Sequence, residues 1–223
     1  MTEMLANPEP LHPDLQPYLF SDDRFGPYLK HPLVFSIPHM EAINPLVNRQ
    51  YIGKLAAVER ATEDGDWELI VSLHERPFRV DAFIEVCGMM TDADYWSTLA
   101  WLWRDSENIR EFPEAWHGLW ASDRPGREQS MSEEEREALA AMPDEITVYQ
   151  GHTSERDDGW SWTTELRVAE WFANRFALLE GDTPMVSTGV VSKAEVIAYF
   201  TARSESEIVV DRAAVRDIRS NVI

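Results

Sequence analysis

The chain has 223 residues, of which 40 are acidic and 20 are basic, so its formal net charge is −20. This length is enough for one domain with a substantial core, or for a domain that carries a sizeable helical subdomain. The strongly negative charge repels nucleic acid and anionic membranes from most of the surface, unless a local basic patch overrides it. Binding through general phosphate contacts is therefore disfavoured.

Cysteine content and hydropathy bear on the compartment. The chain has one cysteine, Cys87, which has no partner for an internal disulfide, and this suits a reducing environment. The first residues, "MTEMLANPEPLHPDLQP", are polar and interrupted by proline, unlike a signal peptide. No apolar run reaches the roughly 18 residues that a membrane helix needs. We therefore expect a soluble, cytoplasmic protein with no membrane partner.

Residues 1–40 are rich in proline, with Pro8, Pro10, Pro13, Pro17, Pro27, Pro32 and Pro38. Proline lacks the backbone N–H that helices use, and it biases the preceding residue toward an extended conformation. We therefore predict an extended N-terminal segment that lies over the surface of the protein.

Residues 41–143 are predicted to form a helical subdomain. Apolar residues recur there at helical spacing, and polar side chains that can cap a helix precede several of these runs. Helices are predicted to begin near Asn44, near Asp66, after Pro77, at Thr91 and at Ser132.

Five tryptophans lie between residues 96 and 120. One interpretation is a platform on which nucleic-acid bases stack, but such platforms come with Lys and Arg that hold the phosphates, and this stretch is neutral to acidic. Packing between helices is the simpler interpretation.

Residues 144–223 change character and alternate short β-branched runs with one helix. Strands are expected at 146–149, 159–163, 185–191, 196–200 and 206–210, and a helix at 165–179. The whole chain is therefore predicted to be α+β, with a helical N-terminal half followed by a mostly antiparallel split sheet.

Two glutamates, Glu205 and Glu207, stand one residue apart in "YFTARSESEIVVD". If both belong to the strand, their side chains point to the same face and lie about 6–7 Å apart along the chain. Either solvent screens this pair of carboxylates, or a functional site uses them.

Three motifs of the second half follow one another in a distinctive order. "VYQGH" is predicted to be an aromatic-glycine turn after a strand, Ser161-Trp162-Thr163 forms a second strand, and Glu205-Ser206-Glu207 comes third. This order resembles the mono-ADP-ribosyltransferases of the arginine-serine-glutamate class, from Ile146 to the C-terminus. In that family an Arg-Gly step anchors the phosphates of NAD, whereas this chain has Gln150 before Gly151.

The resemblance implies an NAD-dependent transferase with the ADP-ribosyltransferase fold and no metal site. It implies that Glu207 stabilises the cation formed when the bond between nicotinamide and ribose breaks, and that Glu205 activates the acceptor. Ser161 is implied to position Glu207, and Trp162 or Phe172 to offer a flat surface to the nicotinamide ring. The remaining residues implied to bind NAD are Tyr149, Gln150, Gly151, His152 and Thr163.

Gln150 departs from the family pattern. A glutamine can donate a hydrogen bond to a phosphate oxygen, but it lacks the charge and the bidentate geometry of arginine. A neighbouring positive charge could compensate for this difference. The candidates are His152, Arg156, Arg167 and Arg175.

The acceptor and the biological setting stay open at this stage. Among acceptors, the resemblance favours the guanidinium group of a protein arginine, and a nucleic-acid base and a small guanidino compound are the other candidates. A toxin, a phage-borne modifier and a defence factor all fit. An NAD glycohydrolase would use the same residues with water as acceptor. A different class of function is a non-catalytic acidic protein that mimics nucleic acid, but Asp and Glu are scattered along this sequence.

Overall fold

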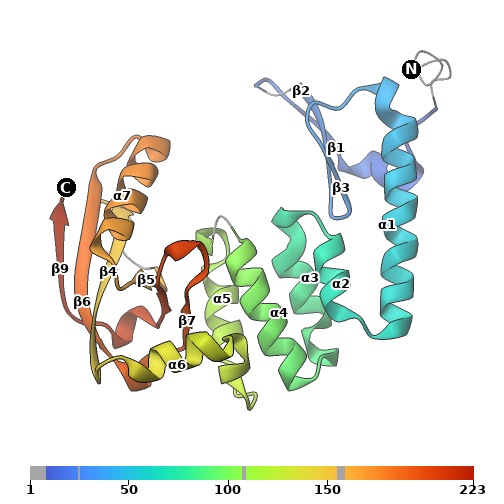
Figure 1. The fold of residues 1–223 in the computed structure, drawn as a ribbon. Helices are drawn as coiled ribbons and strands as arrows, with labels where there is room; N and C mark the ends of the chain where they lie inside the picture. Colours follow the sequence, from blue (N-terminus) through green and yellow to red (C-terminus); the bar gives the residue numbers. More distant parts are fainter. Residues whose placement is uncertain (1–8, 25, 107–108, 155–158) are drawn as a thin grey trace. The chain divides into compact units, whose positions relative to one another are not determined.

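The computed structural model describes residues 9–24, 26–106, 109–154 and 159–223, and it is α+β, as predicted (Figure 1). Helices dominate the N-terminal half, and antiparallel strands dominate the C-terminal half. Contacts divide the chain into an N-terminal unit, residues 1–98 with 104–106, and a C-terminal unit, residues 99–103 with 107–223. This boundary falls inside residues 41–143, which are predicted from the sequence to form one helical subdomain.

The N-terminal unit contains a three-stranded antiparallel sheet where the sequence predicts an extended surface segment. The strands are extended, but they pair with one another, because Pro32 occupies the turn between two of them and Pro38 follows the last. Leu29 and Val34 are fully buried and belong to the core of this unit. The strands are β1 (Leu19–Asp22), β2 (Gly26–His31) and β3 (Val34–Ser36).

Four helices follow these strands, and their predicted starts are confirmed to within a residue or two; residues 99–103 of the fourth belong to the C-terminal unit. The first helix ends at Gly65, whose left-handed conformation (φ 69°) suits glycine. Thr91 caps the fourth helix, since its hydroxyl accepts a hydrogen bond from the amide of Asp94 at 3.2 Å. The helices are α1 (Asn44–Asp64), α2 (Trp67–Leu73), α3 (Arg79–Val86) and α4 (Asp92–Asp105).

The C-terminal unit has three further helices. The start predicted at Ser132 for the second is confirmed by a capping box, in which Ser132 and Glu135 exchange side-chain and backbone hydrogen bonds. The first was not among the predicted helices. They are α5 (Pro113–Trp120), α6 (Glu133–Ala141) and α7 (Leu166–Glu180).

A six-stranded antiparallel sheet forms the body of the C-terminal unit, with strand order β7-β8-β5-β4-β6-β9. Tyr149 on β4 lies opposite Thr163 on β5, and Thr163 lies opposite Glu207 on β8, so the strands of the three motifs are neighbours. The strands are β4 (Glu145–Thr153), β5 (Ser161–Thr163), β6 (Pro184–Ser192), β7 (Ala198–Phe200), β8 (Glu207–Val209) and β9 (Arg216–Val222).

The two faces of this sheet have different neighbours. Val148, Trp162 and Ile208 are buried in the main hydrophobic cluster of the unit. On the opposite face, α7 lies against β4 and β6 (Figure 1), and Ala169 and Ala173 pack there with Val186. Across the described part of the chain, the helices lack the combination of length and apolar character that a membrane crossing requires.

Candidate functional site

The sheet brings Ser161 and Glu207 into direct contact. Ser161 Oγ donates a hydrogen bond to Glu207 Oε1. Because Thr163 lies opposite Glu207, Ser161 occupies the diagonal position two residues along β5, on the same face of the sheet. The register of two adjacent strands therefore assembles this pair, although 46 positions separate the residues in the sequence.

A second donor reaches the same carboxylate oxygen from a helix. Trp103 Nε1 donates to Glu207 Oε1 at 3.0 Å. The Trp103 ring is only 1% exposed, and the rings of Trp116 and Trp120 meet it edge to face at centroid distances of 5.1 and 5.7 Å. From the sequence, these tryptophans are predicted only to pack between helices. A buried indole N–H does need a partner, but the sequence does not indicate which one.

Glu205 does not share a strand with Glu207, and this part of the prediction is wrong. Strand β8 begins at Glu207, and the serines on either side of Glu205 have left-handed backbones, with φ of 58° at Ser204 and 46° at Ser206. Glu205 itself has a helical backbone conformation. The alternation of side chains along a strand therefore does not determine where the Glu205 carboxylate points.

Hydrogen bonds from the segment after β5 hold this loop. Thr163 Oγ1 donates to the carbonyl oxygen of Glu205 at 2.6 Å, and the amide of Thr164 donates to the carbonyl of Ser206 at 3.1 Å. Ser206 Oγ donates to Glu165 at 3.2 Å. The hydrogen bond from Arg167 to the Glu165 carboxylate, followed by the positive charge of Arg167, lowers the pKa of Glu165.

Tyr149 and Gly151 are close to α7. Tyr149 is half-buried against the cluster of Ala169 and Ala173. A Cβ at Gly151 would overlap the carbonyl oxygen of Ala169 and lie 2.6 Å from the amide nitrogen of Ala173. Glycine is therefore required at position 151 by the close approach of the helix, which explains the motif residue without a ligand.

Gln150 is 5% exposed, and its side chain forms a hydrogen bond with the neighbouring strand. Its Nε2 donates to the carbonyl of Ser161 at 3.1 Å, while Oε1 has no hydrogen-bond partner among the residues that the structure describes. Along β4 its side chain alternates with that of Tyr149, so the two point to opposite faces of the sheet. The side-chain amide of Gln150 therefore contacts the backbone of strand β5, which carries Ser161.

The residues considered as replacement charges for Gln150 are engaged or lie elsewhere. His152 is 2% exposed, and its ring nitrogens contact the carbonyl of Thr153 at 2.7 Å and the hydroxyl of Ser187 at 2.8 Å. Arg167 pairs with Glu165, and Arg175 lies over the ring of Trp171. Arg156 falls outside the described residues.

The two aromatic residues proposed to face nicotinamide differ in position. Trp162 is 2% exposed, belongs to the core cluster, and points to the face opposite Ser161 and Thr163. The structure therefore does not present its ring beside the Ser161–Glu207 pair. Phe172 is half-buried on α7, with Trp171 edge to face at 4.8 Å and Phe176 stacked at 5.8 Å.

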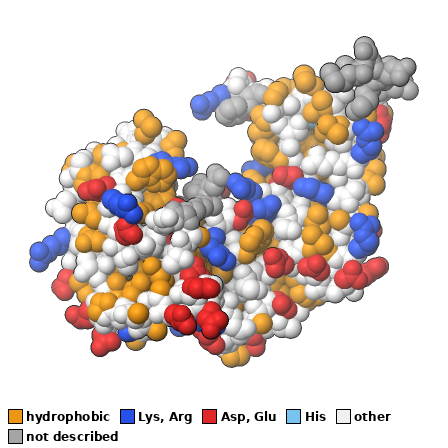
Figure 2. All heavy atoms as spheres, in the orientation of Figure 1, with side chains coloured by type: hydrophobic (Ala, Val, Ile, Leu, Met, Phe, Trp, Pro, Cys, Tyr) orange, Lys and Arg blue, Asp and Glu red, His pale blue; other side chains and the backbone are white. Residues whose placement is uncertain are grey.

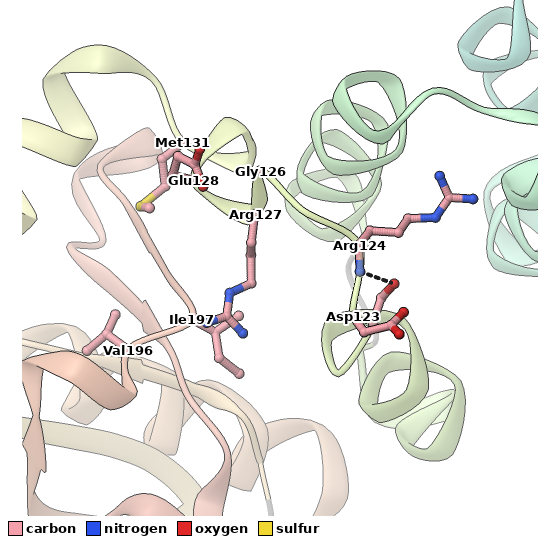
Figure 3. A pocket seen from close by; sticks show the side chains of 9 residues that line it. Asp123, Arg124, Gly126, Arg127, Glu128, Met131, Val196 and Ile197 are labelled. Atoms are coloured by element: carbon pink, nitrogen blue, oxygen red, sulfur yellow. Dashed lines mark hydrogen bonds between the residues drawn. The ribbon is translucent and has the colours of Figure 1, made fainter.

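A separate hollow of about 480 Å³ lies between the loop that follows α5 and the segment before β7 (Figure 3). Arg127 extends across it toward Ile197, whereas Arg124 points away. None of the residues that match the transferase motifs lines this hollow. Its lining comprises Ser122, Asp123, Arg124, Gly126, Arg127, Glu128, Met131, Val196 and Ile197.

Within the described residues, no group of three or more His, Cys, Asp and Glu side chains is placed to hold a metal ion. On the face drawn in Figure 2, acidic side chains are interspersed with basic and hydrophobic ones. The hydrogen bonds from Ser161 and Trp103 hold one oxygen of the Glu207 carboxylate, and a carboxylate of fixed orientation can stabilise a positive charge.

Comparison with known proteins gives no match: no family model, no curated protein and no solved structure matches this chain.

Proposed function

We propose that the protein is an NAD-dependent mono-ADP-ribosyltransferase whose central carboxylate is Glu207. The observation that carries this proposal is the hydrogen bond from Ser161 to Glu207, because it joins the second and third motifs of the resemblance at one place. The strand that carries Tyr149, Gln150 and Gly151 is the next one in the sheet. Three motifs that are far apart in the sequence are thus neighbours in space.

The chemistry follows from the charge that develops at the sugar. When the C1′–N bond of NAD breaks, its electron pair passes to the pyridinium nitrogen, nicotinamide leaves as a neutral molecule, and the ribose gains oxocarbenium character. The Glu207 carboxylate stabilises this cation more than it stabilises the ground state. A nucleophilic atom of the acceptor then bonds to C1′, and the acceptor loses one proton.

Glu205 is proposed to take up that proton or to orient the acceptor. Its side chain is half-buried, and its backbone is fixed by the hydrogen bond from Thr163. In the family that the sequence resembles, a glutamate at this place accompanies transfer to an arginine guanidinium, so a protein arginine is the favoured acceptor and a nucleic acid the alternative. With water as the acceptor, the same steps describe an NAD glycohydrolase.

The experiment that tests the proposal is incubation of the full chain with NAD labelled in the adenylate part. Free nicotinamide is measured by chromatography, and label is measured separately on protein and on RNA or DNA added as acceptors. Release together with transfer supports a transferase, and release without transfer supports the glycohydrolase. Absence of nicotinamide release would refute both.

The decisive variant is Glu207→Gln, which keeps the shape of the side chain and removes its charge. We expect nicotinamide release to fall by about 100-fold or more, the usual effect of removing a group that stabilises transition-state charge. Glu195→Gln, at an exposed glutamate of the same unit, is the matched control and should keep full activity. Full activity in Glu207→Gln would show that Glu207 is not the catalytic carboxylate.

Glu205→Gln should affect the two activities differently from Glu207→Gln. The partner of the developing cation is still present in this variant, so slow release of nicotinamide should persist while transfer to the acceptor falls. Both assays are run side by side on the two variants. Equal losses of release and transfer in both would contradict the division of roles between the two glutamates.

A further inference from the structure

We propose that Trp103 is a positioning residue for the reaction, and that its indole N–H fixes the orientation of the Glu207 carboxylate. This inference rests on the proposed function and adds a residue that the transferase motifs do not contain. The contact lies within the C-terminal unit, to which residues 99–103 of α4 belong. Trp103 Nε1 donates to Glu207 Oε1 at 3.0 Å.

Two donors from different elements meet at one oxygen atom. Ser161 approaches Glu207 Oε1 from β5, and Trp103 approaches it from α4. A carboxylate held by one hydroxyl can rotate about its terminal side-chain bonds, because the hydroxyl turns with it. A second donor with a rigid ring removes that freedom, and pre-set orientation is what electrostatic catalysis depends on.

The ring of Trp103 is itself held in place. It is 1% exposed and packs edge to face between Trp116 and Trp120. The indole cannot turn without disturbing both neighbours, so the direction of its N–H bond is determined by the aromatic cluster. The orientation of the carboxylate therefore depends on how residues 99–103 of α4 pack against α5.

Trp116 offers a matched comparison. It belongs to the same cluster and is 2% exposed, but its Nε1 has no hydrogen-bond partner among the described residues. Trp103→Phe and Trp116→Phe thus remove similar buried volumes, and only the first removes a donor to Glu207. A role in packing alone affects both variants alike.

Loss of the Trp103 donor has a defined consequence for catalysis. A hydrogen bond from N–H favours the ionised carboxyl group, so the group stays protonated to higher pH when the donor is removed. We expect Trp103→Phe to lower kcat for nicotinamide release by about 10-fold, with KM for NAD within about twofold of wild type. The acid limb of its pH–rate profile should move to higher pH, while Trp116→Phe should keep the wild-type profile.

The measurement is steady-state release of nicotinamide between pH 5 and 9 for wild type, Trp103→Phe and Trp116→Phe, with thermal unfolding of each. The predicted kcat loss and shift of the acid limb, confined to Trp103→Phe, would support the proposal. Equal kinetics in the two variants, or a kcat loss without movement of the acid limb, would overturn it. An inactive wild type would refute the proposed function instead, which keeps the two failures distinct.

A second measurement does not depend on activity or on folding of the tryptophan variants. The indole N–H of Trp103 gives one of nine tryptophan side-chain signals in a ¹⁵N–¹H spectrum of the full chain. Glu207→Gln should shift the Trp103 signal and leave the Trp116 signal in place, since the acceptor changes from a carboxylate to an amide. An unmoved Trp103 signal would show that this hydrogen bond is absent in solution.

Discussion

Gly151 shows how closely a single residue joins the sheet of the C-terminal unit to helix α7. Its missing Cβ makes room for the backbone of Ala169 and Ala173, so the helix approaches β4 more closely than any side chain would permit. The motif glycine is thus explained by packing, and the helix it admits is the one that carries Phe172 and covers Tyr149.

We predict that Gly151→Ala lowers the free energy of unfolding by about 1–3 kcal/mol, the usual cost of overpacking a close contact. The control is Gly53→Ala in the middle of α1, where an added Cβ meets nothing within 4 Å and alanine has the better helix propensity. Urea unfolding of both variants measures the difference. A Gly151→Ala variant as stable as wild type would mean that α7 can move away from β4 at little cost.

Glu135 joins helix α6 to the loop between β7 and β8, which carries Glu205. It is 4% exposed, and its carboxylate accepts hydrogen bonds from the amide of Ser132 at 2.9 Å and from the amide of Thr201 at 3.0 Å. Thr201 directly follows β7. One buried side chain therefore caps a helix and anchors the start of the β7–β8 loop.

Glu135→Ala should destabilise the protein by about 1–3 kcal/mol, because it removes a buried carboxylate that caps the helix and accepts hydrogen bonds from the amides of Ser132 and Thr201. Glu137→Ala, on the exposed side of the same helix, should change stability by less than about 0.5 kcal/mol. Hydrogen exchange at Thr201 is the sharper readout, since this amide should lose protection in Glu135→Ala. Unchanged exchange there would contradict the anchoring role.

His31 gives the sheet of the N-terminal unit a pH dependence. Burial lowers the pKa of His31, the nearby His74 lowers it further, and Asp14 partly opposes both. The Nδ1 atom of His31 accepts a hydrogen bond from the amide of Leu33 at 3.0 Å, and a proton on that nitrogen would break the bond. The folded protein therefore prefers the neutral ring.

We expect the free energy of unfolding to fall as pH drops below the ordinary histidine value of about 6.5, because the unfolded chain then binds a proton that the folded chain resists. His31→Gln should lose less stability than wild type between pH 7.5 and 5.5. His117→Gln, at an exposed histidine of the C-terminal unit, should follow wild type. Identical pH slopes in wild type and His31→Gln would contradict the assignment.

Local signals in the sequence predicted the helices better than the sheets. The capping residues Thr91 and Ser132 mark two helix starts correctly, because a cap depends on neighbours three residues away. The sheet of β1–β3 was not predicted, because the many prolines disfavour regular structure. Pro32 and Pro38 in fact lie in the turns and ends beside the strands. Strand β9, "RDIRSNV", is almost wholly exposed at the edge of its sheet, so it lacks the alternation that identifies a half-buried strand.

The candidate site was predictable only in part. The order of motifs indicated that Ser161 and Glu207 belong together, and the structure brings them into contact. The conformation around Glu205 was not predictable from a Glu-x-Glu pattern, since Glu205 and Ser206 form hydrogen bonds with Thr163 and Glu165, which lie 42 and 41 positions away in the sequence. The contact between Trp103 and Glu207 could not be predicted either, because no neighbouring residue in the sequence indicates the hydrogen-bond partner of the indole.

The whole molecule carries a net charge of −20, and repulsion among its negative charges destabilises the folded state. Compaction brings like charges closer together than they are in the unfolded chain, and salt screens their repulsion. We predict that the melting temperature rises between about 20 mM and 500 mM NaCl. An equal osmolality of glycerol is the control for general solvent effects. A melting temperature that falls with salt would mean that ion pairs such as Lys54–Glu75 outweigh the repulsion.

The hydrogen bonds at Glu207 also determine when the site can first exist during synthesis. The carboxylate lies 46 positions from Ser161 and 104 positions from Trp103, so both contacts close long loops. The backbone hydrogen bonds of helices α1 to α6 join residues that are near one another in the sequence, whereas the carboxylate meets its donors only after β8 has been made. The nascent chain therefore cannot bring Glu207 to Ser161 and Trp103 before β8 has been synthesised.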